Sequence, residues 1–344
     1  MRFNFNKEQF YFLVSALVSR FIHFLKLSKS VNSILVIKWD EIGDMVYALH
    51  VFNHLKIQYP DAKITLVCKE FVTPLVQHNS AIDYIRHELP KNEKFDLIVE
   101  LRGNWDTLRY ALFNLPNRRV DRGTVRLANK LKGGQKHEII TNFEIVEPLL
   151  AIGTHNLIPH ITIDENSEKY AQAFIAQHQL NKFAVFHCGA RRILRQWPLE
   201  NFAKLAIFLK ENYDFKIVFA GTMEDEQAIN EIISLGKLDA IVCTKNFSLL
   251  HFASLVKNAS LFIGNESGPL HIAATVNTPL VGIYGPGVKD IFYPIGKQSL
   301  VVHHVLDCNP CDQIHCVRPE NPCINLVTLF EVETKIEQLL GIGC

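Results

Sequence analysis

Short runs of apolar, β-branched residues alternate with longer stretches of helical periodicity along most of this 344-residue chain. The first apolar runs, at 34–37, 62–68 and 97–101, are typical of strands buried on both faces of a parallel sheet. Helical periodicity follows at 44–57 and 71–77. Strands that alternate with helices predict a parallel α/β sheet.

The alternation restarts after Gly153–Ser167, a segment with Gly, Pro, Asn and acidic residues but no helical period. Further strands are expected at 183–187, 216–220, 240–243, 261–264 and 279–284. Because the chain is long enough for two domains of ordinary size, we expect two Rossmann-like domains facing a central cleft. Their expected bounds are 31–160 and 161–344.

Residues 1–30 precede this alternation and form a third segment. The stretch from Phe10 to Leu27 is apolar and aromatic but is interrupted by Arg20, His23 and Lys26. A spanning helix needs about 20 apolar residues with few charges, and a secretory signal needs a small-residue cleavage site. Two interpretations remain open: an amphipathic helix in a membrane interface, or a helix packed on the protein's own surface.

The overall charge excludes little, but its distribution is uneven. A formal charge of +1 gives no global attraction to nucleic acid or membrane, and 48% hydrophobic residues indicate a folded protein. Between 102 and 136, nine Lys or Arg stand against two Asp. Such a run is typical of a solvated face, or of a patch that binds an acidic partner such as a phosphorylated glycolipid. The candidate residues within it for binding such a partner are Arg102, Arg118, Arg119 and Arg122.

The eight cysteines do not resemble the framework of a small secreted protein. Cys68, Cys188 and Cys243 lie in or beside apolar runs and are predicted to be buried free thiols. Four others near the C-terminal end are spaced C-x2-C-x4-C-x6-C: Cys308, Cys311, Cys316 and Cys323. This spacing is compatible with zinc or an iron–sulfur centre. We favour partly buried thiols, or a disulfide formed on oxidation, and predict no bound metal.

A polar loop, Asp40–Asp44, follows the first strand of the first half. Neither half has a G-x-G-x-x-G fingerprint after its first strand, which argues against a nicotinamide oxidoreductase. A turn at Gly43 would place Asp44 at the carboxyl edge of the sheet, where ligands of α/β proteins bind. Asp44 is therefore a candidate catalytic residue, or only the N-cap of the next helix.

A second candidate site lies where a strand passes through a Gly/Ser turn into a helix, at 263–274. Pro269 suits the first helical turn. The unpaired N–H groups and the positive end of the helix dipole form an anion site there. Ser267, Gly268 and His271 could contact that anion. Alternatively, Ser267 only caps the helix and His271 is an ordinary surface or core histidine.

A third element is the loop 187–198, which carries Arg191, Arg192 and Arg195 after the first strand of the second half. Planar, bidentate guanidinium groups suit a diphosphate, although arginines on a loop also serve solubility. Trp197 and Pro198 are predicted to pack the following helix.

Three segments together resemble glycosyltransferase family 9: ILVIKWDEIGD, RQWPLENF, and GNESGPLHIAA followed by PLVGIYGPG. Their order and spacing extend the resemblance over about 31–340, whereas residues 1–30 lie outside it. The family contains the ADP-heptose:lipopolysaccharide heptosyltransferases. The resemblance implies a GT-B-type α/β fold, with the acceptor bound by the N-terminal half and the ADP-sugar by the C-terminal half.

The resemblance also implies a reaction: inverting transfer of a heptose from ADP-heptose to a lipopolysaccharide inner-core acceptor, with Asp44 as general base. No cofactor or metal is required. The implied donor-binding residues are Arg195, Glu224, Glu266, Ser267, Gly268 and His271. Glu266 stands where the family commonly has Asp, so donor preference could differ.

The implied partners are a nucleotide sugar, an acidic glycolipid acceptor and the inner-membrane surface, with no nucleic acid. The expected location is the cytoplasm, peripheral on the cytoplasmic face of the inner membrane. Two alternatives remain open. One is a family member that uses another nucleotide sugar for a different surface glycan. The other is a non-catalytic nucleotide-sugar-binding protein, in which Asp44 is only a cap.

Overall fold

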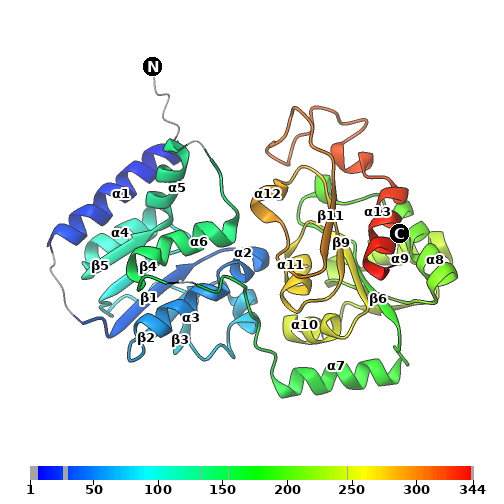
Figure 1. The fold of residues 1–344 in the computed structure, drawn as a ribbon, viewed down its shortest axis with the longest axis horizontal. Helices are drawn as coiled ribbons and strands as arrows, with labels where there is room; N and C mark the ends of the chain where they lie inside the picture. Colours follow the sequence, from blue (N-terminus) through cyan, green and yellow to red (C-terminus); the bar gives the residue numbers. More distant parts are fainter. Residues whose placement is uncertain (1–6, 26–29, 133, 154, 246, 342–344) are drawn as a thin grey trace. The chain divides into compact units, whose positions relative to one another are not determined.

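The computed structural model describes residues 7–25, 30–132, 134–153, 155–245 and 247–341. The chain divides into two compact units, Met1–Thr162 and Ile163–Cys344. Each unit is built on its own parallel sheet (Figure 1), so the predicted α/β class is confirmed. Lys26 and Leu27, which belong to the N-terminal stretch, and Cys344 lie outside the described residues.

The first unit has a five-stranded sheet in the order β3-β2-β1-β4-β5. Every neighbouring pair is parallel, with Ile34 of β1 opposite Ile64 of β2 and Leu97 of β4. Its elements are α1 (Lys7–Leu25), β1 (Ser33–Lys38), α2 (Ile42–Val46), α3 (Leu49–Gln58), β2 (Lys63–Cys68), η1 (Glu70–Leu75), β3 (Tyr84–Arg86), β4 (Leu97–Glu100), α4 (Trp105–Asn114), β5 (Arg118–Asp121), α5 (Arg122–Leu131), α6 (Glu138–Val146) and η2 (Glu147–Leu149).

The second unit has a six-stranded parallel sheet in the order β11-β10-β9-β6-β7-β8. Its elements are α7 (Glu165–Gln177), β6 (Phe183–His187), η3 (Ile193–Arg195), α8 (Leu199–Tyr213), β7 (Lys216–Ala220), η4 (Met223–Asp225), α9 (Glu226–Gly236), β8 (Ala240–Cys243), α10 (Leu249–Lys257), β9 (Leu261–Asn265), α11 (Gly268–Thr275), β10 (Leu280–Tyr284), α12 (Lys289–Phe292), β11 (Ser299–His303), η5 (Cys323–Leu326) and α13 (Leu329–Leu340).

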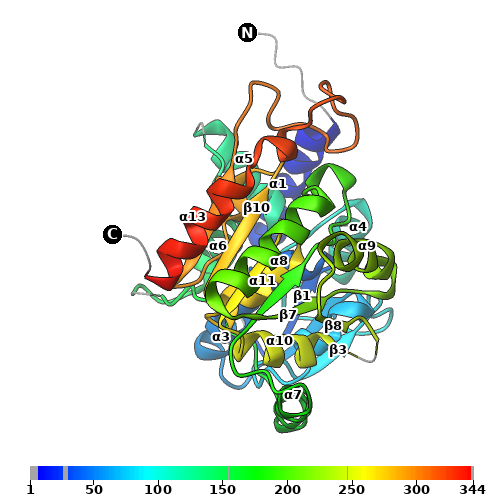
Figure 2. The same cartoon turned by 90° about the vertical axis from the view of Figure 1, so that its right-hand side faces the viewer.

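Helices cover both faces of the second sheet because its right-handed connections run in two directions from the middle. Helices α8, α9 and α13 share one apolar core that contains Phe202, Ile232 and Val332, and Figure 2 shows α8 and α13 side by side. Trp197 is buried there against Phe202, with ring centroids 5.2 Å apart. Its predicted packing role is therefore confirmed.

In each sheet, successive strands are added first toward one side and then toward the other. This reversal of strand order lies between β1 and β4 in the first sheet and between β6 and β9 in the second. Loops that leave the carboxyl ends of strands at such a reversal form the usual ligand site of open α/β sheets. Asp44 follows β1 and Arg102 follows β4. In the second unit Arg195 follows β6 and Ser267 follows β9, so each unit brings predicted site residues to its own reversal point.

Some local expectations need correction. The helix expected at 44–57 is two helices, α2 and α3, which are separated at Tyr47–Ala48. The helix expected at 71–77 is the 3₁₀ segment η1, because Pro74 inside it cannot donate an α-helical hydrogen bond. Cys68, Cys188 and Cys243 are buried free thiols, as predicted. Across the part of the chain that is described, no helix is both long and apolar enough to cross a membrane.

Candidate active site

Asp44 lies in the first turn of α2, directly after β1. The N-cap of α2 is Glu41, so the alternative that Asp44 serves as the cap is wrong. No hydrogen bond holds its carboxylate within the described ranges. Burial raises the pKa of Asp44, and the nearby carboxylates of Asp40 and Glu138 add to this effect. A carboxylate that is not hydrogen-bonded and has a raised pKa is suited to accept a proton.

Two cations act against that shift in the pKa of Asp44: Lys38 and, more weakly, Arg122. The Lys38 ammonium is fully buried at the end of β1, with Nζ 2.7 Å from Oδ2 of Asp40. The sequence analysis did not select Lys38. A lysine inside a strand predicted to be buried on both faces was nevertheless a usable signal, because a buried charge is costly unless it has a partner. The edge of the first sheet therefore balances opposite charges around Asp44.

The four arginines predicted to bind the acceptor differ in burial and in their partners. Arg102 is half exposed, and its Nε lies 3.3 Å from Oδ1 of Asp40. Arg122 is largely buried in a bidentate pair with Glu138, one contact of which measures 3.0 Å. Glu138 also accepts from Arg126 at 3.0 Å. Glu138 was missed because its partners are 16 and 12 residues away in the chain and no motif connects them.

Arg119 does not fit the predicted role of an acceptor ligand. Its side chain is fully buried and pairs with Glu100 and Asp121. It also donates to the Ser15 carbonyl of α1 at 3.0 Å. Its guanidinium therefore holds α1 to the sheet.

Arg118 is corrected for a different reason. It is the first residue of β5 and stands opposite Leu97, the first residue of β4. In a parallel sheet this is the amino edge, about 10 Å from the carboxyl edge at the other end of the four-residue strand. Its Nη2 donates to the Pro148 carbonyl at 2.7 Å. Arg118 therefore lies at the opposite end of the sheet from Asp44.

In the second unit, Ser267 and Gly268 lie where β9 turns into α11. Ser267 occupies the N-cap position but makes no side-chain cap bond, and its hydroxyl donates to the Asn265 carbonyl at 3.1 Å. The start of α11 therefore keeps its positive dipole end without a capping side chain. His271 is buried in the first turn of the same helix.

Arg195 and Glu266 meet at this edge, with Nη1 3.3 Å from Oε1. Burial raises the pKa of Glu266 to about 7, and Arg195 partly opposes that rise. Oε2 of Glu266 is buried without a hydrogen-bond partner among the described atoms. A Cβ on Gly287 would overlap this carboxylate, so the buried Glu266 side chain would have to shift to admit one. The site thus offers one guanidinium and one acceptor oxygen that a ligand hydroxyl could satisfy.

The orientation of Arg195 depends on a residue that the sequence did not indicate. Its Nε donates to Oε1 of Gln313 at 2.7 Å, across 118 residues of chain. Gln313 has a backbone φ of 61°, in the left-handed region. No motif marks it, because only the folded loop brings it to Arg195.

Glu224 is exposed on η4, and no hydrogen bond or ion pair joins it to this cluster among the described residues. The next residue, Asp225, turns its carboxylate toward the loop after β6, where a Cβ on Gly189 would overlap it. Asp225 is also the group that partly offsets the lowering of the His187 pKa by burial. Asp225 is therefore a carboxylate at this edge that the sequence did not indicate, and the donor-binding role of Glu224 stays a prediction.

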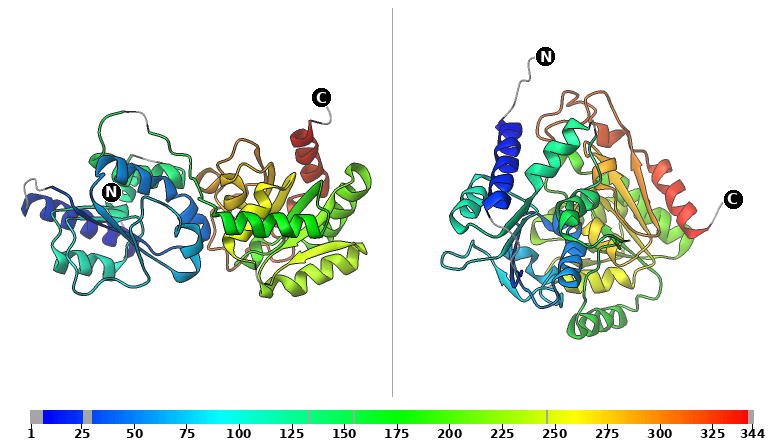
Figure 3. Two further views of the ribbon diagram at one scale, coloured as in Figure 1. Left: turned by 90° about the horizontal axis from the view of Figure 1, so that it is seen from below. Right: turned by 60° about the vertical axis from the view of Figure 1, so that its left-hand side comes forward.

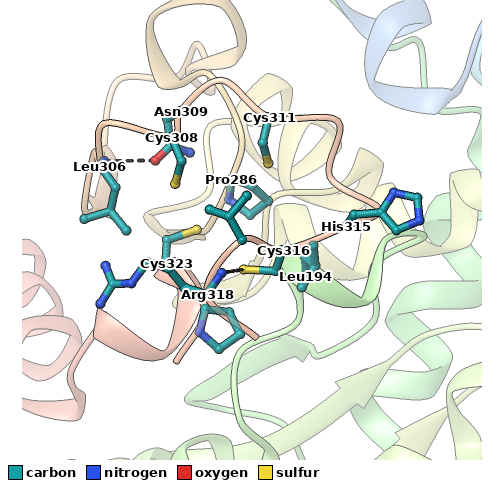
Figure 4. A pocket seen from close by; sticks show the side chains of 12 residues that line it. Leu194, Pro286, Leu306, Cys308, Asn309, Cys311, His315, Cys316, Arg318 and Cys323 are labelled. Atoms are coloured by element: carbon teal, nitrogen blue, oxygen red, sulfur yellow. Dashed lines mark hydrogen bonds between the residues drawn. The ribbon is translucent and has the colours of Figure 1, made fainter. Parts of the chain in front are cut away.

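The four C-terminal cysteines line one pocket next to this site, together with Leu194 and Pro286 (Figure 4). All four are free thiols. Burial raises the pKa of Cys323, and the other three thiols add to that rise. Among the residues that can be described, no three His, Cys, Asp or Glu side chains are arranged to hold a metal ion. The loop that carries these cysteines also carries Gln313.

Comparison with known sequences identifies the family. The sequence model of glycosyltransferase family 9 (heptosyltransferase) matches residues 121–321. The chain belongs to this family. The family 9 enzyme is 25% identical over 284 residues to lipopolysaccharide heptosyltransferase 3 of Escherichia coli, covering 71% of this chain and 80% of the relative.

Solved structures agree on the fold. A family 9 glycosyltransferase from Veillonella parvula superposes with a TM-score of 0.75 at 21% identity, covering 91% of this chain and 99% of that one. The ADP-heptose lps heptosyltransferase II of E. coli superposes with a TM-score of 0.70 at 20% identity, covering 90% and 98%. Membership of the family, and not the shared fold, confirms the predicted enzyme class, a glycosyltransferase, and sets aside the oxidoreductase and non-catalytic alternatives.

Proposed function

We propose that this enzyme transfers a heptose from ADP-heptose to an inner-core acceptor of lipopolysaccharide, with inversion at the anomeric carbon and Asp44 as general base. The observation that carries the proposal is the Asp44 carboxylate, which makes no hydrogen bond within the described ranges and has a raised pKa at the reversal point of the first sheet. The donor and acceptor are supported by the names of relatives that act as heptosyltransferases.

In the proposed step, the acceptor hydroxyl gives its proton to a carboxylate oxygen of Asp44 as its own oxygen attacks the anomeric carbon. The bond between that carbon and the diphosphate oxygen breaks, and ADP leaves from the opposite face. The leaving diphosphate would gain charge beside Arg195 and the uncapped start of α11, with Ser267 and Gly268 in that turn. Such preorganised groups are each worth about 10²–10³ in rate.

Arg102 is the proposed contact for an acidic group of the acceptor, because it is half exposed and follows β4 at the same edge as Asp44. Arg122, paired with Glu138, would set the charge around Asp44. Oε2 of Glu266 would accept from a hydroxyl of the donor. In this scheme the protein's own side chains supply every charge, so no cofactor is required.

A donor other than ADP-heptose is the second candidate, and Glu266 is the observation that favours it. The side chain is one methylene longer than the Asp that the family commonly has. Its carboxylate also packs against Gly287, so its reach toward the donor sugar is set by a close backbone contact.

We also propose that the enzyme works as a peripheral protein on the cytoplasmic face of the inner membrane. The support is the lipid-linked nature of a lipopolysaccharide acceptor, together with the lack of a spanning helix in the described ranges.

The test is acceptor-dependent release of ADP from ADP-heptose, with wild type and Asp44→Asn compared. Removing a general base lowers the rate about 10²–10⁴-fold. The melting temperature should not fall, because Asp44 makes no cap and no hydrogen bond among the described residues. Glu41→Gln, at the actual N-cap, is the matched control and should keep most activity. Asp44→Asn with full turnover would exclude Asp44 as the base, and wild type that uses only other nucleotide sugars would establish the second candidate.

A further inference from the structure

Helix α1 turns apolar side chains away from the protein. Five of them are between 37% and 85% exposed: Phe10, Leu13, Leu17, Phe21 and Phe24. At about 100° per residue these positions fall on one face of the helix. We call these five residues the α1 stripe. Most surface helices have the opposite arrangement, with the apolar face against the core.

The opposite face of α1 holds the helix in this orientation through buried polar contacts. Ser15 Oγ donates to Oδ1 of Asp121 at 2.8 Å, and the Ser15 carbonyl accepts from Arg119. Tyr11 donates to Oε1 of Glu100 at 3.1 Å. Rotating α1 to bury the stripe would break this network and leave buried charges unpaired, which is costly. The outward direction of the stripe is therefore a property of the folded unit.

The surroundings of the stripe combine basic and aromatic side chains. Lys7 and Arg20 are exposed on α1 itself. Helix α5 packs beside α1 (Figures 1 and 3). Two exposed lysines mark the end of α5: Lys130 lies in its last turn and Lys132 at its C-cap. Trp105 is 47% exposed, and its ring centroid lies 6.1 Å from that of Phe10.

We propose that the α1 stripe docks on an anionic lipid surface. An apolar helix face flanked by Lys and Arg inserts at the boundary between headgroups and acyl chains. Basic residues add attraction to anionic headgroups, and an exposed Trp is favoured at that depth. The lysines argue for lipid over a second copy of this chain, since two identical basic surfaces repel each other.

Docking would also orient the first unit. Tyr11 bonds Glu100, the last residue of β4, and Trp105 begins the helix that follows. The stripe therefore starts at the same sheet edge that carries Arg102 and Asp44. That edge would lie close to the lipid surface, within reach of a lipid-linked acceptor. This last consequence rests on the proposed function, whereas the docking itself does not.

The experiment is co-sedimentation of the full-length protein with vesicles of phosphatidylglycerol and phosphatidylethanolamine, or of phosphatidylcholine alone. We expect binding to the anionic vesicles, and a loss of at least about ten-fold in partitioning for Leu17→Gln/Phe21→Gln. Ile57→Gln and Phe330→Gln are matched controls, since both remove exposed apolar side chains elsewhere. They should bind as wild type does. Lys130→Gln/Lys132→Gln should weaken binding several-fold and flatten its dependence on salt.

Wild type that stays in the supernatant, or equal binding to phosphatidylcholine, would overturn the proposal. So would a stripe variant that binds vesicles normally but converts a dimer to a monomer in sedimentation velocity, because a second copy would then cover the stripe. Turnover with a water-soluble core oligosaccharide separates the two proposals. The stripe variant should keep this turnover. If wild type binds vesicles but shows no such turnover, the proposed function is excluded and the docking proposal stands.

Discussion

The two sheet edges share a topology but carry charge in different ways. At the first edge Lys38, Asp40, Arg122 and Glu138 form buried ion pairs around Asp44. At the second edge, Arg195 meets Glu266 beside the uncapped start of α11. Equivalent loops on the same scaffold can therefore suit opposite tasks. In the proposed reaction, the balanced network would hold a base ready for a proton, and the guanidinium beside the uncapped helix start would hold a leaving diphosphate.

The largest effect should come from breaking the buried ion pairs of Arg119, which hold α1 to the first sheet. Arg119→Met leaves Glu100 and Asp121 buried without their cation. We expect a loss of about 3–5 kcal/mol in the free energy of unfolding, measured by urea denaturation. Arg118→Met removes the same charge one residue earlier, at an exposed contact with the Pro148 carbonyl, and should cost less than about 1 kcal/mol. Similar losses for both variants would contradict the buried role of Arg119.

The second edge should instead contain a carboxylate that destabilises the fold at neutral pH. The pKa of Glu266 rises to about 7 in the folded protein from a usual value of 4.5. The folded state thus keeps a proton that the unfolded state has lost. The contribution of Glu266 to stability is full below pH 4.5 and is lost as the pH rises to 7, in total of order 3 kcal/mol. Glu266→Gln should remove this dependence.

The measurement for Glu266 is the free energy of unfolding at pH 5 and pH 7.5, for wild type and variant. Glu224→Gln, at an exposed position of the same unit, should keep the wild-type dependence on pH. If Glu266→Gln keeps it too, Glu266 does not titrate in this interval.

A smaller effect, on the pH dependence of activity, should follow from removing Lys38, the cation that lowers the pKa of Asp44 most. Lys38 lowers the pKa of Asp44, and Lys38→Met should therefore raise it. Because the base must be ionised, activity falls as the pH falls through this pKa. The acid limb of the pH–kcat profile should then move to higher pH. Lys69→Met removes a surface lysine, paired with Glu41 at 2.6 Å, and should leave the limb in place. An unmoved limb in Lys38→Met would mean that Asp44 does not set it.

The smallest effect should come from Gln313→Ala, which frees Arg195 without removing it. Hydrogen bonds to charged groups contribute about 1.5–3 kcal/mol when buried, and this half-exposed one should contribute less. We expect the KM for the nucleotide sugar to rise about 3- to 10-fold, with kcat little changed. Ile314→Ala, at an exposed neighbour in the same loop, should leave KM as it is; an equal rise there would indicate a general effect of the loop.

The α/β class could be predicted from the sequence, because most of the parallel strands leave a short apolar run; β5, with the sequence Arg-Arg-Val-Asp, does not and was missed. The turn at Ser267–Gly268 and the loop with Arg195 could be found for a similar reason: their residues are adjacent in the chain and fall directly after a strand. The break between α2 and α3 at Tyr47–Ala48 could not be predicted, since apolar periodicity continues through it.

By itself, the sequence determined which residues follow the carboxyl end of each strand, because in a parallel sheet that order is a local property. Only the tertiary structure decided which charges meet there. Glu138 reaches Arg122, Gln313 reaches Arg195, and α1 covers Arg119 across separations that leave no periodic signal. The adjacent arginines Arg118 and Arg119 show the physical reason. Successive residues of a strand point to opposite faces. The two arginines therefore differ in burial and in their partners, although they are neighbours in the sequence.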